Sequence, residues 1–239
     1  MQKLLADKED TEQVFHIIEA LNGRSLLNNL EAFAATGAGR AQLARKAYLP
    51  PLLDDHSWIR DLPEGTVGRA YVDFMEREGL TAQGLVDESE KFRSAAKDYD
   101  DDLLWFGNRL RDTHDLYHVL SGYGRDALGE ACLLAFSYSQ NPGRGVIFIA
   151  FMAARQISKS LPKEARVMDC LWEGRRNGRA ASQIIQEDIL QLLREPLEDA
   201  RRRLGIRTPE GYLRALRISA DAGIAARDIS PSAPEQAAA

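Results

Sequence analysis

The sequence predicts an all-α protein, built as a single-domain bundle of many helices. Apolar residues recur with the helical period of about 3.6 residues along most of the chain, whereas strand-like alternation is almost absent. Clusters of glycine, proline and asparagine separate these periodic stretches, as turns between helices do. The chain has 239 residues and no obvious linker in its middle, which suits one large domain. We therefore expect one domain over residues 1–226 and a disordered tail over 227–239.

Capping residues and glycine stops mark where the helices begin and end. Asp10, Thr66 and Asp126 are suitable N-caps, and Gly79 follows the last periodic residue of the helix that Thr66 opens. Prolines and aspartates interrupt residues 37–65, which we expect to form a broken connection with one short helix. The expected helices are, in chain order, 11–21, 25–35, 66–78, 100–120, one that begins at Asp126, 146–158, one after Pro162, 179–203 and a short one opened by Pro209.

Composition and charge exclude several classes of protein. Hydrophobic residues make up 44% and charged residues 28%, an ordinary globular balance. The net charge of -5 arises from basic and acidic residues mixed along the chain, so nucleic acid is not an expected partner. The two cysteines, Cys132 and Cys170, are too few and too far apart for a disulfide framework or a thiolate zinc site, and they fit a reducing compartment.

No segment is expected to cross a membrane or to act as a signal peptide. The most apolar run, 146–154, is far shorter than the roughly 20 residues that a membrane-spanning helix needs. The amino terminus, MQKLLADKED, lacks the apolar core of a secretion signal. The run 146–154 fits a buried core helix, and the wall of a tunnel for an apolar ligand is the second interpretation.

Two histidines, His114 and His118, lie four residues apart in a predicted helix and should project from one face of it. Asp115 lies about 100° around the helix from His114 but only three residues before His118, so its carboxylate borders the same face. Two imidazoles beside a carboxylate are typical ligands of a divalent ion. A pair of histidines at this spacing also occurs by chance in helices, so the pattern alone does not define a reaction.

A second carboxylate follows a predicted reversal of the chain. Gly122 and Gly124 permit a tight turn, Asp126 restarts a helix, and Glu130 falls in about its first turn. A returning helix packed about 8–10 Å away can point Glu130 at the two histidines. We therefore predict a metal site formed by His114, Asp115, His118 and Glu130, with zinc as the preferred ion and iron, manganese or magnesium as alternatives.

The residues around this site resemble a known family. Residues 111–130, RDTHDLYHVLSGYGRDALGE, resemble the central block of the coenzyme Q biosynthesis protein 4 family of ubiquinone biosynthesis, including its signature H-D-x-x-H-x11-E. Residues 62–69, LPEGTVGR, are similar to its L-P-x-G-T-x-G-R segment, and residues 195–212 are similar to its carboxyl-terminal block. The likeness covers roughly 60–215, with no departure at the four ligand positions, and the first 60 residues match only loosely.

The resemblance implies a function. Members of the family are all-helical dimers that bind a divalent metal through this motif and hold isoprenoid lipid in an apolar tunnel beside it. They work with other ubiquinone biosynthesis proteins at a membrane surface. The resemblance implies an oxidative decarboxylase that replaces the carboxylate of a polyprenylated hydroxybenzoate-type precursor with a hydroxyl group. We accordingly expect a cytoplasmic protein attached peripherally to the inner membrane, with Asp115 or Glu130 as the catalytic base.

Other functions fit parts of the same pattern. A non-catalytic scaffold that binds prenyl lipid and organises the pathway's enzymes would use the metal only for structure. A metallohydrolase resembling H-E-x-x-H enzymes is a weaker alternative, because Asp115 is one methylene shorter than the glutamate base of those enzymes. A phosphohydrolase with a His-Asp pair does not account for His118. We interpret Arg69 as structural and the run 201–203 as a solvated cluster that meets the negative end of a helix dipole.

Overall fold

The computed structural model describes residues 24–91 and 101–229, and these residues form an all-α structure, as predicted. Within those ranges the only pairing of strand type is an isolated antiparallel bridge between Thr66 and Pro196. The described residues group into two compact units, which we describe separately. Unit 1 contains 123–180 and 208–229, and unit 2 contains the described part of 24–122 together with 181–207.

Unit 2 contains eight α-helices from the first part of the chain and three short helices from residues 181–207. The former are α3 (Ser25–Ala34), α4 (Gly37–Arg45), α5 (Pro50–Asp54), α6 (His56–Arg60), α7 (Val67–Glu78), α8 (Ala82–Lys91), α9 (Asp101–Asp112) and α10 (His114–Ser121). The latter are the 3-10 helix η2 (Ile184–Gln186), α14 (Ile189–Leu192) and α15 (Leu197–Leu204). The helix expected at 11–21 lies outside the described residues.

Helix α7 begins and ends where the sequence predicts. The Thr66 side chain accepts a hydrogen bond from the Arg69 N–H, and Gly79 ends the helix with a left-handed conformation (φ 66°). The first two N–H groups of the helix bond to a distant segment of the chain. Val67 N–H donates to the Glu195 carbonyl at 2.9 Å, and Gly68 N–H donates to the Leu193 carbonyl at 2.8 Å. Residues 193–197 therefore fix the start of α7.

Three predicted boundaries in unit 2 are wrong. Residues 37–65 form three short helices rather than one, and Thr36 caps the first of them through the Gly39 N–H. The helix expected over 100–120 is interrupted at Thr113, whose hydroxyl donates to the Arg109 carbonyl. The helix expected over 179–203 does not form, because Asp188 caps the short α14 and Pro196 allows a new helix to begin only after it. Tertiary contacts override the apolar spacing in these segments.

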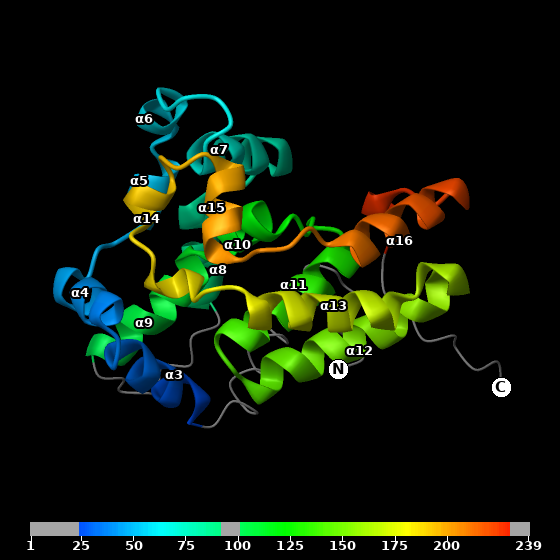
Figure 1. Ribbon diagram of the computed structural model, residues 1–239, viewed down its shortest axis with the longest axis horizontal. Coiled ribbons are helices and arrows are strands. Elements are labelled where there is room, and N and C mark those ends of the chain that lie inside the picture. The colour runs from blue at the N-terminus through cyan, green and yellow to red at the C-terminus, as the bar shows by residue number, and fades with distance from the viewer. Residues whose placement is uncertain (1–23, 92–100, 230–239) are drawn as a thin grey trace. The chain divides into compact units, whose positions relative to one another are not determined.

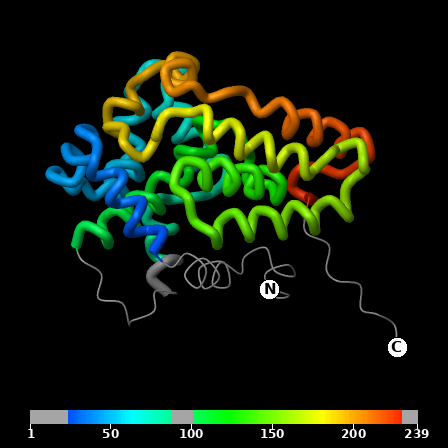
Figure 2. The backbone as a smooth tube through the Cα atoms, turned by 60° about the horizontal axis from the view of Figure 1, so that its bottom comes forward, coloured from blue at the N-terminus to red at the C-terminus, as the bar shows by residue number. Residues whose placement is uncertain are grey.

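Unit 1 is built around three helices that lie side by side, α11 (Ala127–Gln140), α12 (Arg144–Ser160) and α13 (Val167–Ala180) (Figures 1 and 2). It also contains η1 (Lys163–Ala165), α16 (Glu210–Asp221) and η3 (Ala226–Asp228). The predicted apolar helix corresponds to α12. The described start of the expected tail holds η3 and the buried Ile229, and the disorder of 230–239 stays a prediction.

Two glycines allow α13 to lie directly on the backbone of α11. A Cβ atom built on Gly174 would lie 2.4 Å from the Cys132 carbonyl oxygen, and one on Gly178 would lie 2.2 Å from the Phe136 carbonyl oxygen. The Gln140 side chain spans the same contact, because its amide donates to the Gly178 carbonyl at 2.6 Å. No residue with a side chain fits at Gly174 or Gly178 without separating the two helices.

The start of α11 is held by the carboxyl-terminal part of the chain. Asp126 caps the helix as predicted and accepts hydrogen bonds from the N–H groups of Leu128 and Gly129 at 3.1 and 3.0 Å. The Tyr212 hydroxyl of α16 donates to the other oxygen of Asp126 and accepts from the Gly124 N–H. Burial raises the pKa of Asp126, and these hydrogen bonds oppose that rise because they stabilise the carboxylate.

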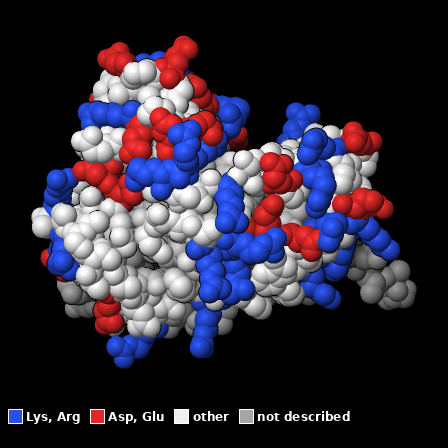
Figure 3. Space-filling model, in the orientation of Figure 1, with Lys and Arg blue, Asp and Glu red and all other residues white. Residues whose placement is uncertain are grey.

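The surface carries both signs of charge. Figure 3 shows basic side chains gathered over α13, with acidic side chains among and beside them. Of the helices that the structure describes, none combines the length and apolarity needed to cross a membrane.

We expect Gly178→Ala to lower the thermal unfolding temperature, because the new methyl group overlaps the Phe136 carbonyl and pushes α13 from α11. Overpacking of this kind costs about 1–3 kcal/mol, and each kcal/mol lowers the midpoint by about 2–4 °C in a protein of this size. Gly37→Ala is the matched control, because no atom lies within 4 Å of a Cβ at that exposed position. Equal midpoints for the two variants, measured by circular dichroism, would contradict the close packing.

Candidate metal centre

Helix α10 brings His114, Asp115 and His118 together in unit 2. One ligand atom of each residue, an imidazole nitrogen or a carboxylate oxygen, lies within 4.8 Å of the others. Asp115 is 8% exposed and His118 is 2% exposed, whereas His114 is partly open to solvent. Among the described residues this is the only such cluster of three potential ligands. The structure thus brings together three of the four residues that the sequence singles out.

The orientation of His118 is set by its neighbours. The rings of His114 and His118 are nearly perpendicular, at 87°, with centroids 5.0 Å apart. On its other side His118 stacks on Phe74 of α7, with centroids 5.4 Å apart and an angle of 23° between the rings. Because the stacked Phe74 ring limits rotation of the His118 imidazole, it fixes the directions in which the two ring nitrogens point.

The last turn of α10 is fixed by Arg201 of α15. Its Nε and Nη2 atoms donate to the carbonyl oxygens of Leu120 and Val119, each at 2.9 Å, while Glu198 binds Nη1 at 2.6 Å. These carbonyls belong to the end of a helix, where they lack partners within the helix. The interpretation of 201–203 as a solvated cluster is wrong for Arg201. Its side chain is only 28% exposed and bonds to the backbone of α10.

A second arginine fixes the helix that precedes α10. Arg109 of α9 is 2% exposed and donates to the carbonyl oxygens of Ile185 and Glu187 at 2.9 and 2.6 Å. Burial lowers the pKa of Arg109 to about 10, so the guanidinium keeps its proton at neutral pH. No local pattern around Arg109 in the sequence marks this role, because its two partners are more than 70 residues away.

Glu130, the fourth predicted ligand, belongs to unit 1. It lies in the first turn of α11, as predicted, and its carboxylate is 3.8 Å from Nε of Arg125. Its side chain is 34% exposed. The approach of Glu130 to the α10 residues stays a prediction, and so does its role as a ligand.

Tyr71 of α7, the helix that packs against α10, is a buried polar residue that no sequence pattern singles out. Its hydroxyl oxygen is shielded from solvent and has no hydrogen-bond partner among the described residues. Burial raises the pKa of Tyr71, and the negative charge of Asp115 raises it further. Its position on the face of α7 that also carries Phe74 could have drawn attention to it, but nothing in the sequence places α7 against α10.

The three α10 residues fit a divalent ion. Two neutral imidazoles and one carboxylate are ligands that zinc, iron and manganese accept, and catalytic zinc sites commonly use three protein ligands with one position left for water or substrate. The buried hydroxyl of Tyr71, on the helix that packs against α10, is available to a ligand bound at this site, since such groups are normally hydrogen-bonded in folded proteins.

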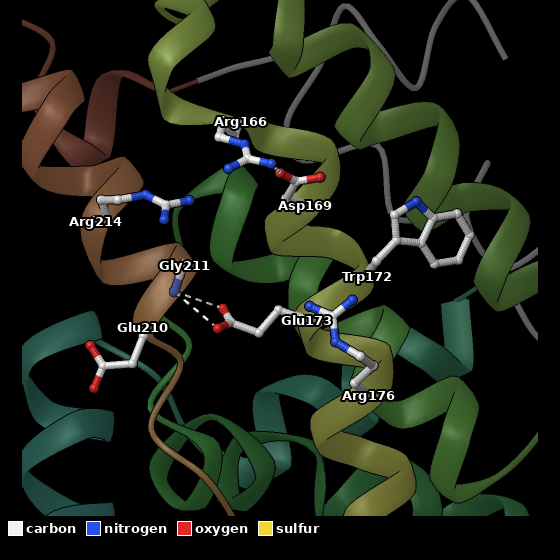
Figure 4. A pocket seen from close by; sticks show the side chains of 8 residues that line it. All are labelled: Arg166, Asp169, Trp172, Glu173, Arg176, Glu210, Gly211 and Arg214. Carbon is white, nitrogen blue, oxygen red and sulfur yellow. Dashed lines mark hydrogen bonds and ion pairs between the residues drawn. The ribbon is translucent and has the colours of Figure 1, made fainter.

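Unit 1 has a separate hollow of about 520 Å³ between α13 and α16 (Figure 4). Three basic and three acidic side chains line it, and the Glu173 carboxylate accepts hydrogen bonds from the N–H groups of Gly211 and Tyr212 at the start of α16. The lining of this hollow is therefore largely charged, so it differs from the apolar lipid tunnel that the family resemblance implies. That tunnel stays a prediction. The lining residues are Arg166, Asp169, Trp172, Glu173, Arg176, Glu210, Gly211 and Arg214.

A known protein family matches most of this chain. The sequence model of the coenzyme Q (ubiquinone) biosynthesis protein Coq4 matches residues 3–210, most of the chain. This chain belongs to the Coq4 family. The resemblance seen in the three segments of the sequence is thereby confirmed, and the Coq4 match includes both the metal motif and the Tyr71 helix.

Two curated relatives carry the same assignment. The mitochondrial ubiquinone biosynthesis protein coq-4 of Neurospora crassa is 31% identical over 180 residues, which cover 75% of this chain and 49% of the relative. The mitochondrial coq4 protein of Pyrenophora tritici-repentis is 30% identical over 210 residues, 87% of this chain and 66% of the relative. The chain thus spans between half and two thirds of the length of these Coq4 relatives.

A solved structure shares the fold. The crystal structure of a candidate ubiquinone biosynthesis protein from Nostoc punctiforme PCC 73102 aligns with a TM-score of 0.62 and 23% sequence identity. The alignment covers 86% of this chain and 94% of that protein. At this identity the comparison supports the all-α fold alone.

We predict that the purified protein binds about one divalent ion per chain. His114→Asn and His118→Asn should each weaken binding by at least tenfold, since changes even in the surroundings of metal ligands cost about 10–100-fold in affinity. His56→Asn is the control, because His56 lies on α6 and pairs with Glu76. Isothermal titration with Zn²⁺ and elemental analysis provide the measurement. A wild-type protein without metal after reconstitution would rule out the site.

Proposed function

We propose that this chain is a metal-dependent enzyme of ubiquinone biosynthesis that exchanges the ring carboxylate of a polyprenylated hydroxybenzoate-type precursor for a hydroxyl group. The observation that supports it best is the group of two imidazoles and a carboxylate on α10, in a chain that belongs to the Coq4 family. A divalent ion at this group would supply a Lewis acid that favours the anionic form of a phenol or carboxylate. In this exchange the bond between the ring and the carboxylate breaks, the carboxylate leaves as CO2, and the ring carbon loses two electrons. With dioxygen as the oxidant, one water is consumed and the electrons leave as hydrogen peroxide.

The proposed roles of the residues follow from their chemistry. His114 and His118 would hold the ion through neutral imidazole nitrogens, and Asp115 would add the negative charge. Phe74 keeps the His118 ring in one orientation and excludes water from one side of it. A base must take the proton of the ring hydroxyl, and Asp115 and Glu130 are the two candidates. Whichever of the two carboxylates does not bind the ion would act as this base.

The main competing proposal is a lipid-binding scaffold with a structural ion. Four protein ligands close a tetrahedral site, whereas three leave a position at which a substrate oxygen can bind. The three clustered residues of α10 support the enzyme, and a fourth bond from Glu130 would support the scaffold. From the same family resemblance we also propose that the protein acts together with other ubiquinone biosynthesis proteins and at a membrane surface.

We expect Asp115→Asn to lower ubiquinone formation about 10–100-fold while the fold is retained, because the near-isosteric change removes the negative charge of the group. Asp73→Asn is the matched control. Asp73 is 59% exposed and pairs with Arg60 on the surface, where solvent screens the interaction. Each variant is expressed in a bacterial strain that lacks its own member of the family, and quinones and their precursors are quantified by mass spectrometry.

The two functional proposals differ in what accumulates in that strain. The enzyme proposal expects a prenylated ring that still carries its carboxylate, both in the null strain and with the Asn variant. A folded Asn variant that restores ubiquinone to the wild-type level would exclude Asp115 as a working residue and would favour the scaffold.

We also expect a homodimer that carries a prenyl lipid. The exposed Phe148 and Phe151 of α12 and the family resemblance support this expectation. Light scattering gives the mass of the assembly, and extraction with organic solvent followed by mass spectrometry identifies the lipid. A monomer from which no prenyl lipid can be extracted or exchanged would contradict both parts.

A further inference from the structure

Tyr71 is a buried residue whose hydroxyl bonds to no other residue in the described ranges 24–91 and 101–229. Its side chain is 1% exposed. A hydroxyl removed from water without a new partner costs free energy, so buried hydroxyls in folded proteins almost always meet a protein group, a water molecule or a ligand. Since no described residue bonds this hydroxyl, we expect a bound ligand or a water molecule to be its partner.

The position of Tyr71 relates it to the metal group. Tyr71 and Phe74 are three residues apart and share one face of α7, and Phe74 stacks on His118. Helices α7 and α10 pack against each other within unit 2. Tyr71 thus lies one helical turn from the residue that contacts a predicted metal ligand.

Burial raises the pKa of Tyr71 most, and the negative charges of Asp115, Asp54 and Asp112 raise it further. Two of these three carboxylates already accept hydrogen bonds from other protein groups. Asp54 accepts hydrogen bonds from the N–H groups of Ala82 and Gln83, at 2.6 and 2.9 Å, and so caps α8. Asp112 accepts from the Arg111 guanidinium at 2.8 Å. The carboxylate with the strongest effect on Tyr71 is therefore the one that belongs to the metal group.

We infer that the Tyr71 hydroxyl donates a hydrogen bond to an anionic oxygen of a small ligand bound at the α10 metal group, and that this ligand is an aromatic carboxylate or phenolate. The inference rests on the proposed metal site. A tyrosine hydroxyl supplies a donor without adding a charge, and a hydrogen bond from O–H to an anionic oxygen is stronger than one between neutral groups. Tyr71 is then a residue that positions the substrate, and its hydroxyl is not needed to hold the ion.

The test separates ligand binding from metal binding. Wild type, Tyr71→Phe and Tyr123→Phe are loaded with Co²⁺, whose visible absorption reports its coordination, and are then titrated with benzoate. Tyr123→Phe is the matched control, because Tyr123 is also buried, 2% exposed, but its hydroxyl already accepts a hydrogen bond from Asn177. We expect all three proteins to bind Co²⁺ with equal affinity. Tyr71→Phe should bind benzoate at least about tenfold more weakly, and Tyr123→Phe should bind it as wild type does.

Each other outcome is informative. Equal benzoate affinity in Tyr71→Phe and wild type, with Co²⁺ bound in both, would overturn the role of Tyr71 and leave the metal site standing. Wild type that binds Co²⁺ without any spectral response to benzoate would also overturn it. Wild type that binds no Co²⁺ would remove the metal site itself, and with it the inference. A loss of Co²⁺ affinity in Tyr71→Phe would assign the hydroxyl to the support of a metal ligand in place of the substrate.

Discussion

The candidate metal centre depends on the way in which α10 is held. A helix of eight residues does not persist in water by itself, since helices shorter than about 12–15 residues are marginal. Arg201 satisfies two carbonyls of its last turn, Phe74 packs on His118 from α7, and Arg109 anchors α9 immediately before it. Because the three predicted ligands lie within five residues, any shift of α10 would move all of them together.

Two sequence segments that resemble the family carry no catalytic group, and their contacts give them a structural role. They hold α7, which packs against α10. Residues 62–69 meet the first residues of the 195–212 segment at the start of α7. There Val67 N–H donates to the Glu195 carbonyl, and Gly68 N–H donates to the carbonyl of Leu193, just before that segment. A Cβ at Gly68 would lie 2.9 Å from the Leu193 carbonyl oxygen, so a glycine allows the segments to pair at this distance. These segments hold the helix that presents Phe74 and Tyr71, and in that way they serve the site.

Local features of the sequence predicted the parts of the fold that local physics controls. The caps Thr66 and Asp126 act over a few residues, and both are confirmed. The spacing of His114 and His118 correctly predicted that the two side chains lie close together, and their binding of a metal stays a prediction. The residues that hold the site were missed because their partners lie far along the chain, 76–82 residues away for Arg109 and Arg201. The break-up of 179–203 was missed for the same reason, since Ile185 and Glu187 bond to Arg109 through backbone carbonyls that a continued helix would use internally.

The separation between α10 and Arg201 also has a consequence for synthesis. When a ribosome has completed the metal motif, about 80 residues of chain are still to be made before Arg201 appears. At roughly 5–20 residues per second this takes several seconds, during which the last turn of α10 lacks the guanidinium that bonds its carbonyls. An ion at the proposed site would meet a loosely held motif early in synthesis and the finished motif after release of the chain. If the site binds an ion as proposed, the order of the segments in the chain favours loading late in the life of the nascent chain.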